Sequence, residues 1–171
     1  QYVTFIGNTV VCRDETDSGN TDGLTCQAAD YVIDSNVVMR PYGSGIFAQN
    51  VILGCETDIG GVISNNEVIE PGGVGVYVQN LGQTMRGVAV DGNTVKGSSR
   101  ISGSTAAIQL YAQSGAIFNW TCDGNTIANG LGVGITLRGA SNVDGNANLY
   151  DGSCVGNSVH LSGTANNGDG L

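Results

Sequence analysis

The pentapeptide DGNTV, Asp91–Val95, returns as DGNTI at Asp123–Ile127. Related phrases stand near both ends of the 171-residue chain, IGNTV at Ile6–Val10 and VGNSV at Val155–Val159. Alignment on the Asn of each phrase gives six in-phase positions: Asn8, Asn36, Asn66, Asn93, Asn125 and Asn157. The intervals are 28, 30, 27, 32 and 32 residues, and such regular spacing indicates a repeat architecture.

Apolar residues stand at fixed distances from each of these Asn residues. Two positions later comes a β-branched aliphatic residue in all six repeats: Val10, Val38, Val68, Val95, Ile127 and Val159. Three positions earlier comes an apolar residue: Phe5, Ile33, Ile63, Val90, Cys122 and Cys154. Four repeats continue into a second alternating run: GIFAQ at 45–49, GVYVQ at 75–79, AIQLY at 107–111 and GITLR at 134–138. Alternation with period 2 indicates strands with one buried face.

Short strands, a long repeat and equivalent inward positions predict a solenoid, in which each repeat is one turn and like residues stack on like. We expect about six turns within one domain, residues 1–162, followed by a flexible tail at 163–171. Parallel neighbours lie ~4.8 Å apart, so the rod would be on the order of 30 Å long. The recurrent Gly-Asn would occupy a sharp corner, where left-handed backbone angles are tolerated. Stacked Asn side chains could then form an amide ladder, although Gly-Asn is also a common turn dipeptide.

The bulk composition excludes some partners. The net charge is −9, with 6 Lys and Arg against 15 Asp and Glu, so nucleic-acid phosphates and anionic membranes would be repelled. No apolar run approaches the length of a bilayer span, so we expect neither nucleic-acid binding nor membrane insertion. Because the repeat is already running at residue 6, we expect the chain to be a piece of a longer protein.

With its GNTV-type corners, inward aliphatic stacks and GVGVYVQ-type second strands, the chain resembles the right-handed parallel β-helix, or pectate-lyase-like, superfamily over roughly residues 3–161. That superfamily includes pectin-cleaving enzymes, alginate-modifying enzymes, phage tailspikes and bacterial adhesins. The long repeat, the variable loops and a composition rich in Gly, Ser, Asn and Thr with little Lys are most similar to tailspikes. The resemblance implies an all-β, right-handed solenoid, a virion or extracellular location, and a bacterial surface polysaccharide as partner.

Asp91 and Asp123 are the candidate catalytic residues. Both stand two positions before a repeat Asn, so adjacent turns could bring their carboxylates within ~5–6 Å. That arrangement suits a polysaccharide hydrolase or lyase, or a Ca²⁺ site. The favoured alternative is that Asp-Gly-Asn is simply turn chemistry, in which the Asp side chain accepts backbone hydrogen bonds. Whether the protein is an enzyme is left open.

The outward positions of the second strands predict a sugar-binding face. Phe47 and Tyr77 fall in one column, and Gln79, Tyr111 and Arg138 fall in the next. Aromatic rings stack on sugar C–H surfaces, while Gln and Arg bond hydroxyls and carboxylates. Alternatively, outward aromatic residues are ordinary in sheets, or a neighbouring chain covers them.

A second outward column suggests association between chains. Val11, Met39 and Ile69 lie in it, with Val37 beside them, and a soluble monomer seldom exposes such a stripe. Since tailspikes are typically trimers, a homotrimer is the natural hypothesis. The alternative function is therefore a non-catalytic structural or adhesion segment of a trimeric fibre.

The five cysteines, at 12, 26, 55, 122 and 154, form no zinc pattern. Cys122 and Cys154 share one inward position, where buried free thiols are favoured over a bridge. Cys12 and Cys26 bracket a polar loop and are the best candidates for a disulfide. The same loop holds Asp14, Glu15, Asp17 and Asp22, which fit a solvated loop better than a Ca²⁺ site, so no cofactor is expected. We also expect Glu67 and Glu70 at a solvated edge and the single His160 at the surface.

Overall fold

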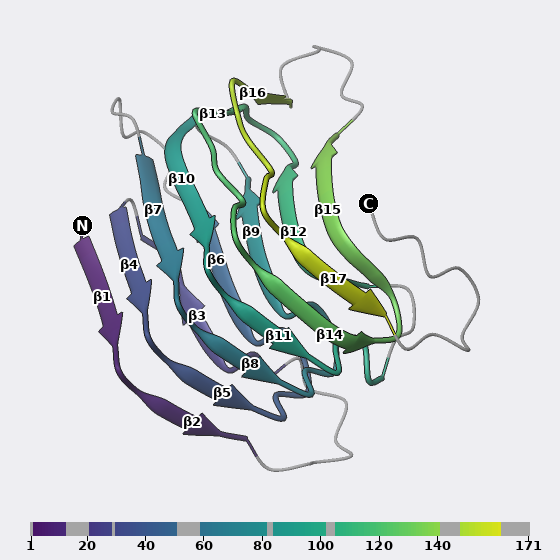
Figure 1. The fold of residues 1–171 in the computed structure, drawn as a ribbon. Helices are drawn as coiled ribbons and strands as arrows, with labels where there is room; N and C mark the ends of the chain where they lie inside the picture. The colour runs from purple at the N-terminus through teal and green to yellow at the C-terminus, as the bar shows by residue number, and fades with distance from the viewer. Residues whose placement is uncertain are drawn as a thin grey trace.

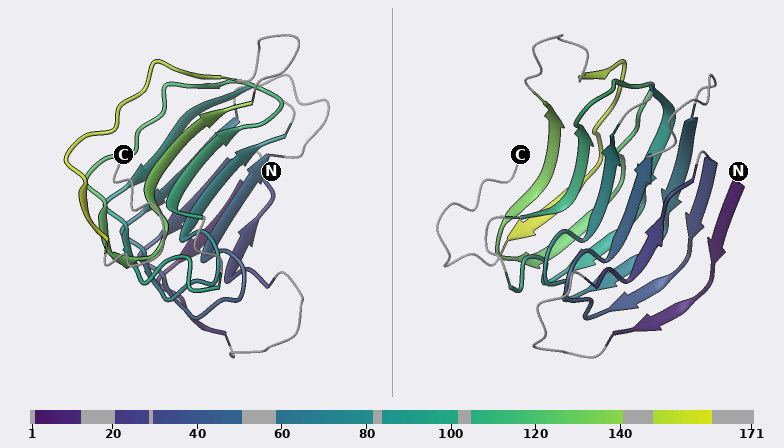
Figure 2. Two further views of the ribbon diagram at one scale, coloured as in Figure 1. Left: turned by 90° about the vertical axis from the view of Figure 1, so that its right-hand side faces the viewer. Right: turned by 180° about the vertical axis from the view of Figure 1, so that it is seen from behind.

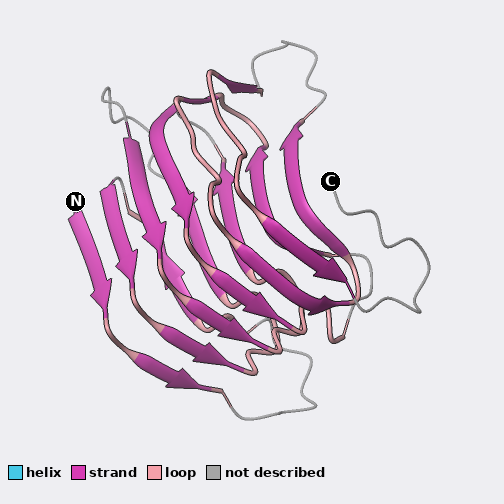
Figure 3. Cartoon of the chain, in the orientation of Figure 1, coloured by secondary structure: helices cyan, strands magenta, loops and turns pink. Residues whose placement is uncertain are grey.

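A computed structural model describes residues 2–12, 21–28, 30–50, 59–81, 84–101, 105–140 and 148–161. These ranges contain β-strands and no helix (Figure 3). Within them, accordingly, there is no helical segment with the length and apolar character needed to cross a bilayer. The tail expected at 163–171 lies outside the described residues.

The strands form three parallel sheets around one core (Figure 1). The first sheet contains β1 (Tyr2–Ile6), β4 (Asp30–Asp34), β7 (Ile59–Ser64), β10 (Met85–Asp91), β13 (Ile117–Phe118) and β16 (Leu149–Tyr150). The second contains β2 (Thr9–Val11), β5 (Val37–Met39), β8 (Glu67–Ile69), β11 (Thr94–Lys96), β14 (Thr126–Gly130) and β17 (Ser158–Leu161). The third contains β3 (Leu24–Cys26), β6 (Ile46–Asn50), β9 (Val76–Asn80), β12 (Ala106–Ala112) and β15 (Val133–Gly139).

Neighbouring strands in every sheet are about one repeat apart in sequence, which confirms the predicted parallel β-solenoid. Val68 pairs with Val95, and Val95 pairs with Ile127, in the expected parallel register. The chain winds from the first sheet through the second to the third and back again (Figure 2). The described part of the third sheet has one strand fewer than the other two, so the complete turns are slightly fewer than the six expected.

The core consists of the inward columns of the three sheets. Val38, Val68 and Val95 of the second sheet are fully buried, as are Ile33 and Ile63 of the first. The third sheet contributes a further column of fully buried aliphatic residues: Ile46, Val76 and Ile108. Because each column meets the two others, one continuous apolar interior runs along the solenoid.

The corner between the first and second sheets explains the repeated phrase. In the inner turns the ladder Asn is buried, and its Nδ2 donates to the Oδ1 of the Asn in the following turn, at 2.9 Å from Asn36 to Asn66 and from Asn66 to Asn93. The predicted amide ladder is thereby confirmed. The left-handed residue is the one before the Asn, as in Gly92 (φ 65°), and the same position accepts Ser35 (φ 56°).

Candidate functional site

The outer face of the third sheet gathers all five residues predicted to bind substrate. In one column Phe47 pairs with Tyr77, and Tyr77 pairs with Gln109. In the adjacent column Gln79 pairs with Tyr111, and Tyr111 pairs with Arg138. We call this face the platform, defined by the outward residues Thr25, Gln27, Phe47, Gln49, Tyr77, Gln79, Gln109, Tyr111, Thr136 and Arg138.

Two stacking contacts stiffen the platform. The rings of Phe47 and Tyr77 are stacked, with centroids 5.1 Å apart and planes inclined by 22°. The Arg138 guanidinium carbon lies 4.7 Å from the centroid of the Tyr111 ring, within cation–π range. Half-burial, followed by the proximity of Tyr111, raises the pKa of Tyr77, while Arg138 and Gln79 oppose that shift. Tyr77 therefore remains a neutral phenol at physiological pH, available as a donor.

A chain of Gln amides crosses the platform beside the aromatic residues. Gln27 Nε2 donates to Gln49 Oε1 at 3.0 Å, and Gln49 Nε2 donates to Gln79 Oε1 at 2.6 Å. Gln79 in turn donates to Gln113. Sequence reasoning missed Gln27 and Gln113 as members of this chain, because both lie just beyond the ends of their strands. The chain holds the amides in fixed orientations.

The structure brings Asp91 and Asp123 onto adjacent turns, as expected. Asp91 Oδ1 accepts a hydrogen bond from the Asp123 backbone N–H at 2.9 Å. Thr121 Oγ1 lies 2.9 and 2.8 Å from the two Asp91 carboxylate oxygens. Each contact fastens one turn to the next, so Asp91 has the capping role that was the alternative interpretation.

Asp123 repeats the same contacts one turn later. It accepts the Val155 backbone N–H and the Ser153 hydroxyl, both at 2.8 Å. Asp34 occupies the equivalent position two turns before Asp91, where it accepts hydrogen bonds from Ser64, Ser35 and Asn65. These hydrogen bonds, that of Ser64 above all, hold the pKa of Asp34 below its ordinary value. Asp34, Asp91 and Asp123 thus accept hydrogen bonds at the same corner of different turns. A catalytic role for Asp91 and Asp123 stays a prediction.

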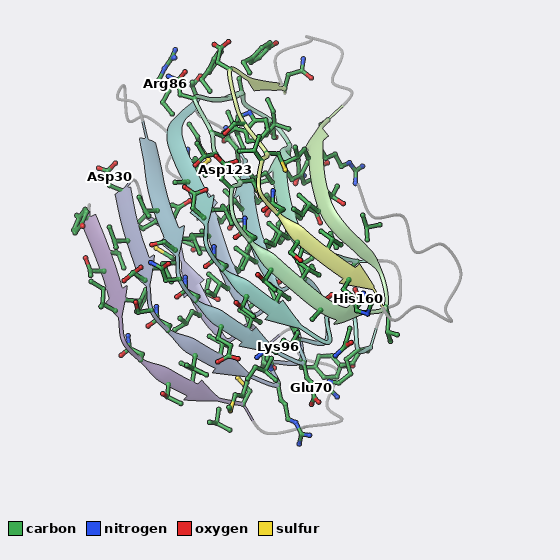
Figure 4. The ribbon with its side chains drawn as sticks, viewed as in Figure 1. Asp30, Glu70, Arg86, Lys96, Asp123 and His160 are labelled. Atoms are coloured by element: carbon green, nitrogen blue, oxygen red, sulfur yellow. The ribbon has the colours of Figure 1, made fainter. Side chains whose placement is uncertain are left out.

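The acids and the platform belong to different sheets. Asp91 ends β10 of the first sheet, whereas the platform lies on the third. Glu67 and Glu70 form exposed ion pairs on the second-sheet side, Glu67 with Lys96 at 2.6 Å and Glu70 with Arg40 at 2.8 Å. Glu70 directly follows β8 and Lys96 ends β11, both well away from Asp123, and His160 stands exposed on β17, as expected (Figure 4).

A second aromatic stack, on the first sheet, was not predicted. Phe118 and Tyr150 stack with centroids 4.8 Å apart, and the Arg86 guanidinium carbon lies 4.5 Å from the Phe118 centroid. Arg86 stands at the outer end of β10 (Figure 4). This stack resembles the platform in chemistry but carries no Gln chain, so it provides an internal control for experiments on the platform.

The described cysteines are free thiols. For Cys122 and Cys154 this confirms the favoured interpretation, and burial raises the pKa of both thiols. The disulfide expected between Cys12 and Cys26 is wrong, because Cys26 points into the core at 2 % exposure. Cys55, Asp14, Glu15 and Asp17 lie outside the described residues. Elsewhere in the described ranges, no three His, Cys, Asp or Glu side chains converge as metal ligands would.

Comparisons with family models, with curated proteins and with solved structures found no match to this chain. The parallel β-solenoid therefore rests on the strand register and the Asn ladder.

Proposed function

We propose that the platform binds a cell-surface polysaccharide and that the protein is a tailspike-like β-solenoid segment acting outside the cell or on a virion. The observation that carries the proposal is the convergence of Phe47, Tyr77, Gln79, Tyr111 and Arg138 on the outer face of one sheet. Five residues chosen for their chemistry occupy two adjacent columns of parallel strands.

The platform has the chemistry that sugar recognition requires. Half-buried aromatic rings offer apolar surface to sugar C–H groups. The accessible amides of Gln27 and Gln79, which the buried Gln49 holds between them, offer donors and acceptors to hydroxyls. The parallel strands hold these groups in place, so little conformational entropy is lost on binding. A repetitive flat surface of this kind fits a linear, repetitive ligand.

Binding is better supported than cleavage. Among the described outward residues of the platform there is no carboxylate, and glycoside hydrolysis ordinarily needs two beside the scissile bond. Asp91 and Asp123 lie on the first sheet and are engaged in corner hydrogen bonds. If the protein cleaves its ligand, these two acids are the residues we propose for the reaction.

The test uses a panel of bacterial capsular and O-antigen polysaccharides. Binding is measured by calorimetry, and cleavage by the release of new reducing ends or unsaturated uronates. Tyr77→Ala should weaken binding by up to about tenfold, since loss of a stacked ring costs about 0.5–1.5 kcal/mol. Phe118→Ala removes an equivalent ring from the first sheet and should leave affinity unchanged. Equal losses in the two variants would contradict the proposal.

One observation favours a second candidate, a structural segment of a homotrimeric fibre. Val11 of the second sheet is 67 % exposed, and Val37, Met39 and Ile69 are partly exposed beside it. Packing this stripe around a threefold axis would cover it. Light scattering tests the trimer, and a single species of monomer mass would count against it. Met39→Glu should convert a trimer into monomers without disturbing the buried Val38 next to it.

A further inference from the structure

One inward column of the solenoid changes its chemistry in two successive turns. The position three residues before each ladder Asn holds Phe5, Ile33, Ile63 and Val90 in four turns, and Cys122 and Cys154 in two. Cys122 is fully buried in the core, and Cys154 packs against the same core. Because aliphatic and aromatic residues fill this column elsewhere, packing alone does not require two thiols in succession.

The two cysteines are neighbours on adjacent turns. Thr121 and Ser153, the residues directly before them, form a parallel bridge, and the Cys122 N–H donates to Ser153 O at 3.0 Å. The segments that follow β13 and β16 run side by side here (Figure 1). Burial, and next the proximity of Cys154, raises the pKa of Cys122. Side chains in register on parallel neighbours point the same way, so the sulfur atoms lie about one strand spacing apart, ~4.8 Å.

This spacing suits a cation between the sulfurs better than a disulfide. A disulfide needs its sulfurs about 2.05 Å apart, and both thiols are free. A metal–thiolate bond is about 2.3 Å long, so two such bonds in line span about 4.6 Å, close to the strand spacing. The Cβ–Sγ bonds point into the solenoid and the metal bonds would run along it, so each sulfur would bind with the bent geometry of a thiolate ligand.

Ladder amides already lie against both sulfurs. Asn125 Nδ2 lies 3.6 Å from Cys122 Sγ, and Asn157 Nδ2 lies 3.3 Å from Cys154 Sγ. A neutral thiol accepts such a hydrogen bond weakly, whereas a charged acceptor binds its donor more strongly. Two thiolates around a monovalent cation carry one net negative charge, and the two amide donors offset part of the cost of burying it.

The number of ligands selects the class of cation. Among the described residues, no third His, Cys, Asp or Glu side chain converges with the two thiols. Zn²⁺ in structural sites is held by four ligands, and Ca²⁺ and Mg²⁺ take oxygen ligands. Soft monovalent cations of the Cu(I) class prefer sulfur and accept two ligands in line.

We propose that Cys122 and Cys154 form a two-coordinate site for a soft monovalent cation of the Cu(I) class. Binding breaks two S–H bonds and forms two S–Cu bonds, and two protons pass to the solvent with no change in oxidation state. The bound cation joins two successive turns inside the solenoid. It therefore stabilises the folded chain in proportion to its concentration and affinity. This site is independent of the platform and of its ligand.

Anaerobic titration with Cu(I) against a competing chelator tests the site. The chelator is set to remove Cu(I) from a single thiol such as Cys12, and the metal that stays on the chain is measured by elemental analysis. The wild type should keep one Cu(I) per chain, whereas Cys122→Ala and Cys154→Ala should each keep none. Cys26→Ala is the matched control, because it removes a buried thiol whose strand neighbour is Ala48, and it should keep the metal.

X-ray absorption should show two sulfur neighbours around the bound Cu(I), and added Cu(I) should raise the melting temperature of the wild type. Circular dichroism verifies that each variant is folded. If Cys122→Ala is not, Cys122→Val replaces it, since Val90 fills the same column one turn earlier. Retention of Cu(I) by either single variant overturns the proposal, as does a wild type that keeps none. Zn²⁺ held as tightly as Cu(I) would also overturn it, because Zn²⁺ would need ligands beyond the two thiols.

Discussion

The backbone N–H of Asn93 lies 2.9 Å from Oδ1 of Asn125, thirty-two residues later in the chain, and both side chains are fully buried. The Asn93 amide also donates to Ile63 O at 2.8 Å, while its Oδ1 accepts hydrogen bonds from Asn66. One side chain thus satisfies two backbone groups of the preceding turn, the Ile63 carbonyl and the Asn66 N–H. Buried backbone groups need such partners where the chain bends out of a sheet.

Asn93→Ala should therefore be strongly destabilising. It orphans the Asn66 N–H and the Ile63 carbonyl, and each buried unsatisfied group costs about 1–3 kcal/mol. We expect the free energy of unfolding to fall by about 3 kcal/mol in urea titrations. Asn8→Ala, the same change at the exposed end of the ladder, should cost much less. Equal costs at the two positions would contradict the ladder's role.

Acid should weaken the corner at Asp34. Hydrogen bonds from Ser64, Ser35 and Asn65 lower the pKa of this carboxyl in the folded state. The stabilisation is present above the unfolded-state pKa and is lost as pH falls through the lower folded-state pKa. Ser64→Ala should raise the pKa of Asp34 toward its ordinary value in a carboxyl NMR titration and flatten the acid limb of the stability curve. Ser153→Ala, which removes the equivalent donor to Asp123, should leave the pKa of Asp34 where it is.

The fold was predictable because, in a solenoid, residues that lie one repeat apart in the sequence are neighbours on adjacent strands. Each ladder Asn predicts its neighbour one repeat later, and Val68 does lie beside Val95. The platform was predictable for the same reason, since alternation along β9, over Ile46–Ala48 of β6 and over Ile108–Ala112 of β12 separates inward from outward residues. Variable loop length between strands did not disturb either prediction.

The role of the Asp carboxylates and the aromatic stack on the first sheet depend on contacts that residue identity does not determine. Asp-Gly-Asn suits a catalytic carboxylate and a capping carboxylate equally, and only the positions of Thr121 and Ser153 reveal the cap. The Arg86–Phe118 contact was missed because the register of β10 against β7 shifts between Met85 and Val88, which breaks the alternation. The partner strand β13 has only two residues, too short to show a period.

Tyr31→Phe should stabilise the protein. Tyr31 is 1 % exposed and its hydroxyl has no hydrogen-bond partner, while burial raises the pKa of the phenol and keeps it neutral. Removing the unsatisfied hydroxyl should raise the free energy of unfolding by about 1 kcal/mol. The ring itself is needed, because it fills the space left by Gly61, where an added Cβ would lie 2.3 Å from Tyr31 Cε2. Tyr31→Ala should accordingly be destabilising, and a destabilised Tyr31→Phe would show that the hydroxyl has a partner.

Arg138 should decide whether the platform prefers acidic sugars. It is the one charged residue among the described outward residues of the platform, and its guanidinium is exposed above Tyr111. A guanidinium binds a uronate carboxylate bidentately, and hydrogen bonds to charged groups contribute about 1.5–3 kcal/mol. Arg138→Gln should weaken binding of a uronate-containing polysaccharide by tenfold or more and reduce the dependence of its affinity on salt, while a neutral polysaccharide is affected little. Arg86→Gln alters the similar Arg–aromatic contact on the first sheet and should leave both affinities unchanged. If Arg138→Gln weakened the acidic and the neutral ligand equally, Arg138 would be acting through its packing on Tyr111 and not through its charge.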